Sequence, residues 1–339
     1  EWGIKILGAY VGTDEYVVNA LRCKMVSIRE LTQIMLYYPN VQARYYLHRF
    51  CYNAKVNYWM RAQFPKHVAP FVQDFKEQQQ KLIASYHGIH DGKDFNHDRR
   101  HFDDLYQRVA LPIEKGGMAL NNAVYVSLTA FACSIAASMK ELAKVFPDWI
   151  RIGSDGKLAN VVCHKSPDVA DQIVDFAHEY RLIAPQGPFK EGDDLLAVMK
   201  SIEAIDARRG ATTVQGVLYS YLIEEEANRL SETVKRKANE SRDHTSYSKV
   251  KWRNWFSLMN SDSGAWLTAG LSPKLFVMSN DEFISAVCRR NTVQDPRVPK
   301  YTSALSRESY DLFQCGCDGG AQPKAIDPFG YHLVGCKIG

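Results

Sequence analysis

The dominant feature of this chain is a series of long segments in which apolar residues recur at helical spacing and which end at proline or glycine. The first segment stops at Pro39 and carries Val17, Leu21, Met25 and Ile28. Residues three or four positions apart share one face of a helix, so the pattern predicts an amphipathic helix covered by other elements. Because similar segments follow along most of the chain, we predict a mainly α fold.

Further helices are predicted at about residues 41–64, 68–86, 122–146, 168–182, 193–205, 212–240 and 279–290. Near the N-terminus, the weak alternation of Ile4-Lys5-Ile6-Leu7 before Gly8 predicts a short strand and turn. The polar residues 87–104 include four histidines and predict an exposed loop. The run from Pro112 to Gly117 predicts a tight turn, since proline and paired glycines favour turns.

Bulk properties narrow the class of protein. The chain has 339 residues and a net charge of +4, which alone is too small to indicate nucleic-acid binding. Its eight cysteines do not resemble a secreted disulfide framework. We find no signal peptide and no run of 18 apolar residues, so we expect a soluble protein in a reducing compartment, the nucleus or cytoplasm, without membrane contact. Both ends read as cuts within a longer polypeptide.

The distribution of charge is more informative than its total. Residues 235–253 include seven basic and two acidic residues, so this segment has a net charge of +5. The basic residues are Lys235, Arg236, Lys237, Arg242, Lys249, Lys251 and Arg253, and Trp252 and Trp255 lie among or beside them. Cations interleaved with aromatic rings suit a surface that follows phosphates and stacks bases. A solvated helix face is an equally good interpretation.

The last 25 residues contain four potential metal ligands: Cys315, Cys317, His332 and Cys336. Thiolate and imidazole groups in such a set can bind zinc tetrahedrally, and four protein ligands make a structural rather than a catalytic site. The intervening loop is rich in glycine and proline and is too short for an apolar core of its own. The Cys-x-Cys spacing is tighter than usual, so free thiols with an incidental histidine are the alternative.

Three segments, in order, resemble parts of reverse transcriptases of non-LTR retrotransposons that carry a downstream restriction-like endonuclease. Residues 3–12, Gly-Ile-Lys-Ile-Leu-Gly-Ala-Tyr-Val-Gly, are similar to the primer-grip hairpin at the end of the palm. Pro112 through Gly116-Gly117-Met118-Ala119-Leu120 resembles the segment after the thumb. Gly264-Ala265-Trp266-Leu267 and Glu282-Phe283, followed by the Cys-Cys-His-Cys set, resemble the linker and its knuckle.

The resemblance implies a domain order: a hairpin remnant at 1–12, a helical thumb at 13–110, a helical linker at 111–314 and a zinc knuckle at 315–339. It also implies that the thumb contacts the phosphates of a template–primer duplex. The candidate residues for this contact lie in the second predicted helix and are Arg44, His48, Arg49, Lys55 and Arg61.

The resemblance does not imply catalysis by this chain. The aspartate pair of a polymerase palm would lie before residue 1 and the endonuclease after residue 339, and polymerase chemistry needs carboxylates that hold two metals. We therefore expect a non-catalytic portion of an RNA-directed DNA polymerase that binds RNA, DNA or both, within a larger polypeptide or ribonucleoprotein. The alternative is a domesticated helical scaffold in a larger assembly, which would bind no nucleic acid.

Overall fold

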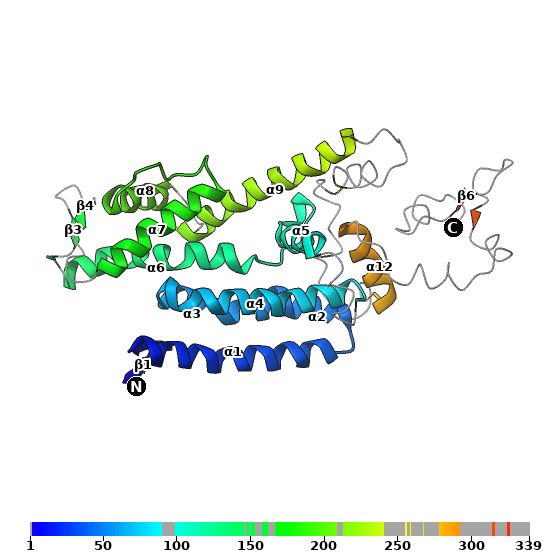
Figure 1. Cartoon of the computed structure of the whole chain (residues 1–339), viewed down its shortest axis with the longest axis horizontal. Coiled ribbons are helices and arrows are strands. Elements are labelled where there is room, and N and C mark those ends of the chain that lie inside the picture. Colours follow the sequence, from blue (N-terminus) through cyan, green and yellow to red (C-terminus); the bar gives the residue numbers. More distant parts are fainter. Residues whose placement is uncertain are drawn as a thin grey trace. The chain divides into compact units, whose positions relative to one another are not determined.

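The computed structural model describes residues 2–89, 99–145, 147–148, 150–152, 158–161, 167–208, 213–240, 255, 258, 267, 278–291, 314–315 and 324–325. These residues are mainly helical, with a small antiparallel hairpin at the N-terminus, as the sequence predicts (Figure 1). The helices are α1 (Asp14–Tyr37), α2 (Val41–Leu47), α3 (Ala54–Ala62), α4 (Pro65–Tyr86), α5 (Arg99–Ala110), α6 (Ala123–Val145), α7 (Pro167–Ile183), α8 (Leu195–Arg208), α9 (Val214–Glu240) and α12 (Asn280–Asn291).

The N-terminal hairpin pairs β1 (Gly3–Ile6) with β2 (Ala9–Gly12). Leu7 and Gly8 form its two-residue turn, with φ angles of 48° and 91°. Positive φ at both positions is the geometry whose twist matches an antiparallel pair of strands. The Tyr58 hydroxyl donates to the Leu7 carbonyl and thereby fixes the turn against α3. The predicted strand and turn are thus confirmed.

The predicted helix over residues 41–64 is interrupted. A π-helical turn, His48–Tyr52, separates α2 from α3. Hydrogen bonds in a π turn span five residues rather than four, so the side chains that follow are rotated around the helix axis relative to an uninterrupted α-helix. Around the π turn, Leu47 and Phe50 are exposed, whereas Tyr45 and Tyr52 are buried.

The interpretation of residues 87–104 as an exposed loop is wrong at both of its ends. His87 is fully buried, and α5 begins at Arg99. Helix α5 forms because Leu105, Tyr106 and Val109 recur at helical spacing and become buried. The histidines at 90 and 97 lie outside the described residues.

Two further strand pairs were not predicted. Strand β3 (Ile150–Ile152) pairs with β4 (Leu158–Val161), and β5 (Gln314–Cys315) pairs with β6 (Lys324–Ala325); both pairs are antiparallel. A short strand of two to four residues carries too little alternation to be recognised from sequence.

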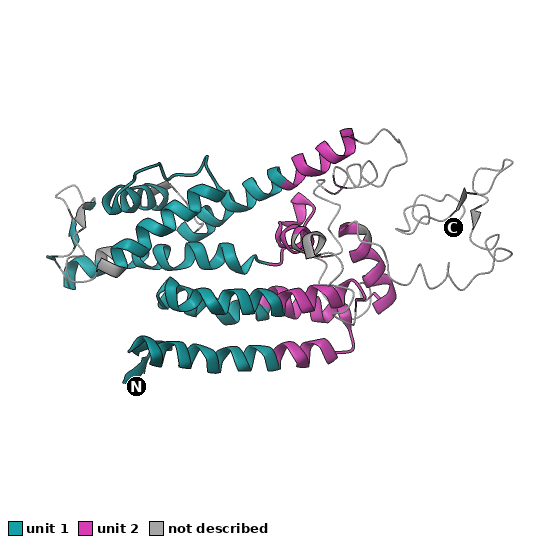
Figure 2. Cartoon of the chain, in the orientation of Figure 1, with its two compact units in different colours: residues 1–30, 51–78, 121–229 teal, residues 31–50, 79–120, 230–339 magenta. Residues whose placement is uncertain are grey.

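The chain forms two compact units, each built from three segments (Figure 2). Unit 1 comprises residues 1–30, 51–78 and 121–229, and unit 2 comprises 31–50, 79–120 and 230–339. In unit 1, α3 packs on α6, and α7 packs on α6 and α8. A cluster of rings formed by Phe176, Tyr180 and Phe189 lies in its core.

The core of unit 2 forms where α12 packs on α2 and α5. The rings of Tyr86 and Phe283 both contact that of Tyr45, with centroids 6.1 Å and 5.9 Å away. The Tyr45 hydroxyl donates to the Met118 carbonyl at 2.7 Å, and burial raises the pKa of Tyr45 to about 12. The boundaries proposed for thumb and linker stay a prediction.

Candidate nucleic-acid interface

Two of the predicted phosphate-contacting residues in unit 2 are buried. Arg44 donates from its guanidinium to the Tyr38 carbonyl at 2.7 Å, and burial lowers its pKa. His48 lies with Nδ1 3.0 Å from the Tyr86 hydroxyl oxygen. In this conformation both side chains face the core of unit 2 rather than solvent, so neither is placed to meet a phosphate.

Arg49 is partly exposed and is held in place by two contacts. Its guanidinium donates to the Leu267 carbonyl at 3.2 Å and lies 4.8 Å from the centroid of the Phe50 ring. Phe50 is 62% exposed, and the ring of Tyr46 lies nearly parallel to it, at 7° with a centroid separation of 6.2 Å. Arg49 therefore presents a cation beside the exposed ring of Phe50 and the partly buried ring of Tyr46.

The other two residues of this predicted set, Lys55 and Arg61, belong to α3 in unit 1 and are exposed. Arg61 donates to the Gln215 side-chain oxygen through Nε at 2.9 Å and through Nη2 at 2.7 Å. A neutral amide oxygen does not cancel the charge of the guanidinium. Both residues keep their charge at the surface of unit 1.

The second predicted basic segment begins at the C-terminal end of α9. Lys235, Arg236 and Lys237 are all exposed there. Lys235 lies 3.6 Å from Glu232, and Arg236 lies 2.9 Å from Glu240. Exposed ion pairs are weak and easily exchanged, so these cations stay available to another anion. The remaining basic residues of the segment, and one of its tryptophans, lie outside the described residues: Arg242, Lys249, Lys251, Arg253 and Trp252.

Trp255, predicted to stack on bases, is only 1% exposed. The guanidinium of Arg108 lies 4.6 Å from the centroid of its ring. Arg108 also donates to the carbonyls of Arg290, at 2.8 Å, and Asn291, at 3.1 Å, at the end of α12. Cations at a helix C-terminus offset the helix dipole. Trp255 thus covers a buried arginine in unit 2 and offers no face to a base in this structure.

The glycine pair at 116–117 forms the predicted tight turn, which Arg290 holds in place. Gly116 has a φ of 80°, and a Cβ atom on Gly117 would lie 2.1 Å from the Leu111 carbonyl oxygen. Arg290 donates through Nε to the Gly117 carbonyl at 2.8 Å and through Nη2 to the Ile113 carbonyl at 2.6 Å. Burial lowers the pKa of Arg290 to about 10, below which the side chain stays charged. The turn is therefore a packed junction of unit 2.

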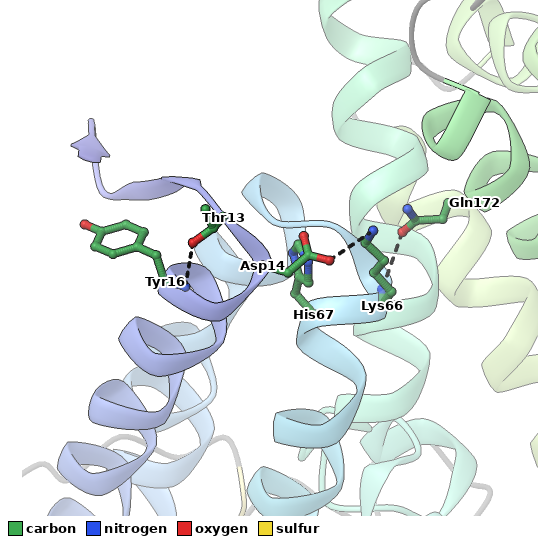
Figure 3. A network of polar contacts seen from close by, with 6 residues as sticks. All are labelled: Thr13, Asp14, Tyr16, Lys66, His67 and Gln172. Carbon is green, nitrogen blue, oxygen red and sulfur yellow. Dashed lines mark hydrogen bonds and ion pairs between the residues drawn. The ribbon is translucent and has the colours of Figure 1, made fainter. Parts of the chain in front are cut away.

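A polar network joins the N-termini of two helices in unit 1 (Figure 3). Asp14, in the first turn of α1, accepts from His67 Nε2 at 3.0 Å and lies 3.6 Å from Lys66 Nζ. The contact with His67 holds the pKa of the Asp14 carboxyl below its usual value. The Lys66 backbone N–H donates to the Gln172 side-chain oxygen at 3.4 Å. The network ties the first turns of α1 and α4 to each other and α4 to α7.

The predicted zinc ligands are described only in part. Cys315 lies in β5, opposite Lys324 in β6, so the backbone of the predicted knuckle does reverse direction beside its first ligand. Cys317, His332 and Cys336 lie outside the described residues. Within the part of the chain that is described, no three His, Cys, Asp or Glu side chains gather as a metal site. Zinc binding stays a prediction.

None of the described helices is long and apolar enough to span a bilayer.

Comparisons with models of protein families, with curated proteins and with solved structures each find no match. The resemblance to reverse transcriptases therefore rests on the sequence motifs alone.

Sequence reasoning missed the arrangement of Tyr46, Arg49 and Phe50, because it predicted one uninterrupted helix over residues 41–64. One signal was present: residues 31–50 contain no aspartate or glutamate but five aromatic residues. The roles of Arg108 and Arg290 were also missed, since a buried arginine that binds carbonyl oxygens has no sequence pattern.

Proposed function

We propose that this chain is a nucleic-acid-binding, non-catalytic portion of a reverse transcriptase-like retroelement protein. In this role it clamps a template–primer duplex and positions the target. The order of the three motif segments supports the class of parent protein. The helical fold and the exposed cations on α3 and α9 are what such a role requires.

The observation that carries the proposal is the exposure of Lys235, Arg236 and Lys237 at the end of α9. Three consecutive cations on a helix point in different directions, and nevertheless all three are exposed. They begin a segment whose net charge exceeds that of the whole chain. Lysine and arginine contacts to phosphates fix a nucleic acid in place without reading its sequence.

The test is a salt titration of binding to a short labelled RNA–DNA duplex, followed by fluorescence anisotropy. Each lost phosphate contact lowers the slope of log K against log salt by about 0.7–0.9, so replacing three cations lowers it by about 2–3. The test variant changes three residues to glutamine: Lys235, Arg236 and Lys237. The control variant makes the same change of charge at exposed lysines of unit 1, Lys144, Lys190 and Lys200.

We expect the control to keep the wild-type slope. A wild-type protein that does not bind the duplex at low salt would refute the proposal. If both triple variants lower the slope equally, binding reflects overall charge and the assignment to α9 is wrong.

We also propose that Cys315, Cys317, His332 and Cys336 hold one structural zinc ion. The antiparallel pairing of β5 with β6 supports this, because it places Lys324 opposite Cys315. The metal, when bound, would tie the segment together and supply no catalysis. Elemental analysis of the wild type should give one zinc per chain, and Cys336→Ser should lose it, whereas the exposed Cys23→Ser should not. Equal zinc in all three proteins would exclude the knuckle.

A scaffold function is the second candidate, and the N-terminal hairpin favours it. Leu7 at the turn is 92% exposed, and Trp2 is 71% exposed. Large exposed apolar side chains clustered on one element are typical of protein interaction sites. A folded wild-type chain without salt-dependent nucleic-acid binding would favour this function over the first.

A further inference from the structure

Three side chains at the end of α2 form what we call the aromatic platform: Tyr46, Arg49 and Phe50. Tyr46 and Phe50 are four residues apart and lie on one side of the chain where α2 passes into the π turn. Their rings are nearly parallel, at 7°, and the Arg49 guanidinium lies 4.8 Å from the Phe50 ring centroid. Two planar aromatic groups and a planar cation are therefore assembled at the surface of unit 2.

Phe50 is the exposed member of the platform, whereas Tyr46 and Arg49 are partly buried. Phe50 keeps 62% of its surface exposed, although its neighbours Tyr45 and Tyr52 are buried. Arg49 is anchored by its hydrogen bond to the Leu267 carbonyl at 3.2 Å. A ring fixed by a neighbouring ring and a guanidinium loses little freedom when a ligand covers it, which favours binding.

The charge around the platform selects among possible ligands. The segment 31–50 contains no acidic residue, and of its two arginines Arg49 belongs to the platform whereas Arg44 is buried. The acidic residues Asp281 and Glu282 of α12 lie beyond Asn280, which accepts a hydrogen bond from the Val41 N–H at the other end of α2. A ligand with a flat ring and a nearby negative charge fits this environment.

We infer that the aromatic platform stacks an unpaired base of a single-stranded nucleic acid, with Arg49 beside the adjoining phosphate. Every nucleobase has a planar face that stacks on aromatic rings and guanidinium groups, so recognition is independent of sequence. Bases within a duplex are covered on both faces and cannot stack in this way. This inference rests on the proposed nucleic-acid-binding function and adds that the chain distinguishes unpaired from paired regions.

The test compares two labelled probes: a blunt RNA–DNA duplex, and the same duplex with a single-stranded tail of deoxythymidines. We expect Phe50→Ala to weaken binding of the tailed duplex by roughly 5- to 150-fold, the effect of losing one stacked base. Binding of the blunt duplex should stay within experimental error of wild type. Phe50→Tyr keeps a ring and should bind the tailed duplex as wild type does.

Tyr37→Ala is the matched control, because Tyr37 is an aromatic residue of the same segment and is 84% exposed. It should leave both affinities unchanged. The thermal unfolding midpoint of each variant is measured first, and exposed positions should tolerate these changes.

Equal affinity of Phe50→Ala and wild type for the tailed duplex would overturn the inference, as would equal losses on both probes or an equal loss in Tyr37→Ala. In those cases salt-dependent binding by wild type would leave the proposed function standing. If wild type binds neither probe, the proposed function and this inference both fail.

Discussion

The replacement Gly117→Ala tests how much close packing at the turn bound by Arg290 contributes to the stability of the fold. The added Cβ would lie 2.1 Å from the Leu111 carbonyl oxygen and 2.5 Å from its carbon. Both are backbone atoms, so relief requires the chain to move by about 1 Å rather than a side chain to rotate. The same Leu111 oxygen accepts the Ala119 N–H at 2.8 Å, and this hydrogen bond would be strained by the movement.

The magnitude follows from these two effects. Overpacking of this kind costs about 1–3 kcal/mol. A weakened hydrogen bond adds about 0.5–1.5 kcal/mol, so we expect the free energy of unfolding to fall by roughly 2–4 kcal/mol. Urea denaturation followed by far-UV circular dichroism gives the change in midpoint.

Gly192→Ala is the control because it introduces backbone strain without crowding by neighbouring atoms. Gly192 has a φ of 78°, but a Cβ there meets nothing within 4 Å. Only the cost of a left-handed residue applies, about 1–2 kcal/mol. If Gly117→Ala proves no more destabilising than Gly192→Ala, the close approach of Gly117 to Leu111 does not govern the turn.

Two further predictions concern buried polar groups. Burial lowers the pKa of His87 in the folded protein to about 4, compared with 6.5 for an exposed histidine. Above pH 6.5 the side chain is neutral in both states. As the pH falls from 6.5 toward 4, the unfolded chain binds a proton that the folded protein does not, so the fold loses stability. The pH dependence of the urea midpoint between those values should be shallower in His87→Gln, and an unchanged dependence would contradict the assignment. Tyr125 donates to the buried carboxylate of Glu226 at 3.0 Å. Removing this donor in Tyr125→Phe should cost about 1.5–3 kcal/mol by urea denaturation, whereas Tyr221→Phe, on an exposed ring, should cost almost nothing.

The helices that could be predicted from sequence are those with strong local signals. Helix α1 begins at Asp14 and stops before Pro39, and its buried stripe of Val17, Leu21, Met25 and Ile28 follows the predicted spacing. These features depend on residues within a few positions of each other. The first half of helix α5 was assigned to a loop because residues 99–104 are mostly polar, whereas Leu105, Tyr106 and Val109 form its described apolar stripe.

The candidate interface was less predictable because it depends on tertiary partners. Arg44 is buried since the Tyr38 carbonyl accepts its hydrogen bond, and His48 is buried against Tyr86, which lies 38 residues further along the chain. Both partners lie outside α2, so the spacing of apolar residues within α2 does not predict these contacts. The exposed basic residues of α9 were correctly placed on a helix, because that helix has a regular apolar stripe. Their binding of nucleic acid stays a prediction.

The hydrogen bond from Arg290 to the Gly117 carbonyl joins residues 173 positions apart, so it cannot form until most of the chain has been synthesised. Ribosomes add about 5–20 residues per second, so the turn emerges roughly 10–35 s before the arginine that holds it. During that interval the Ile113 and Gly117 carbonyls lack this donor, and α5 lacks its packing against α12. Nascent chains that end before Arg290 should therefore be more sensitive to proteases in unit 2 than the finished protein.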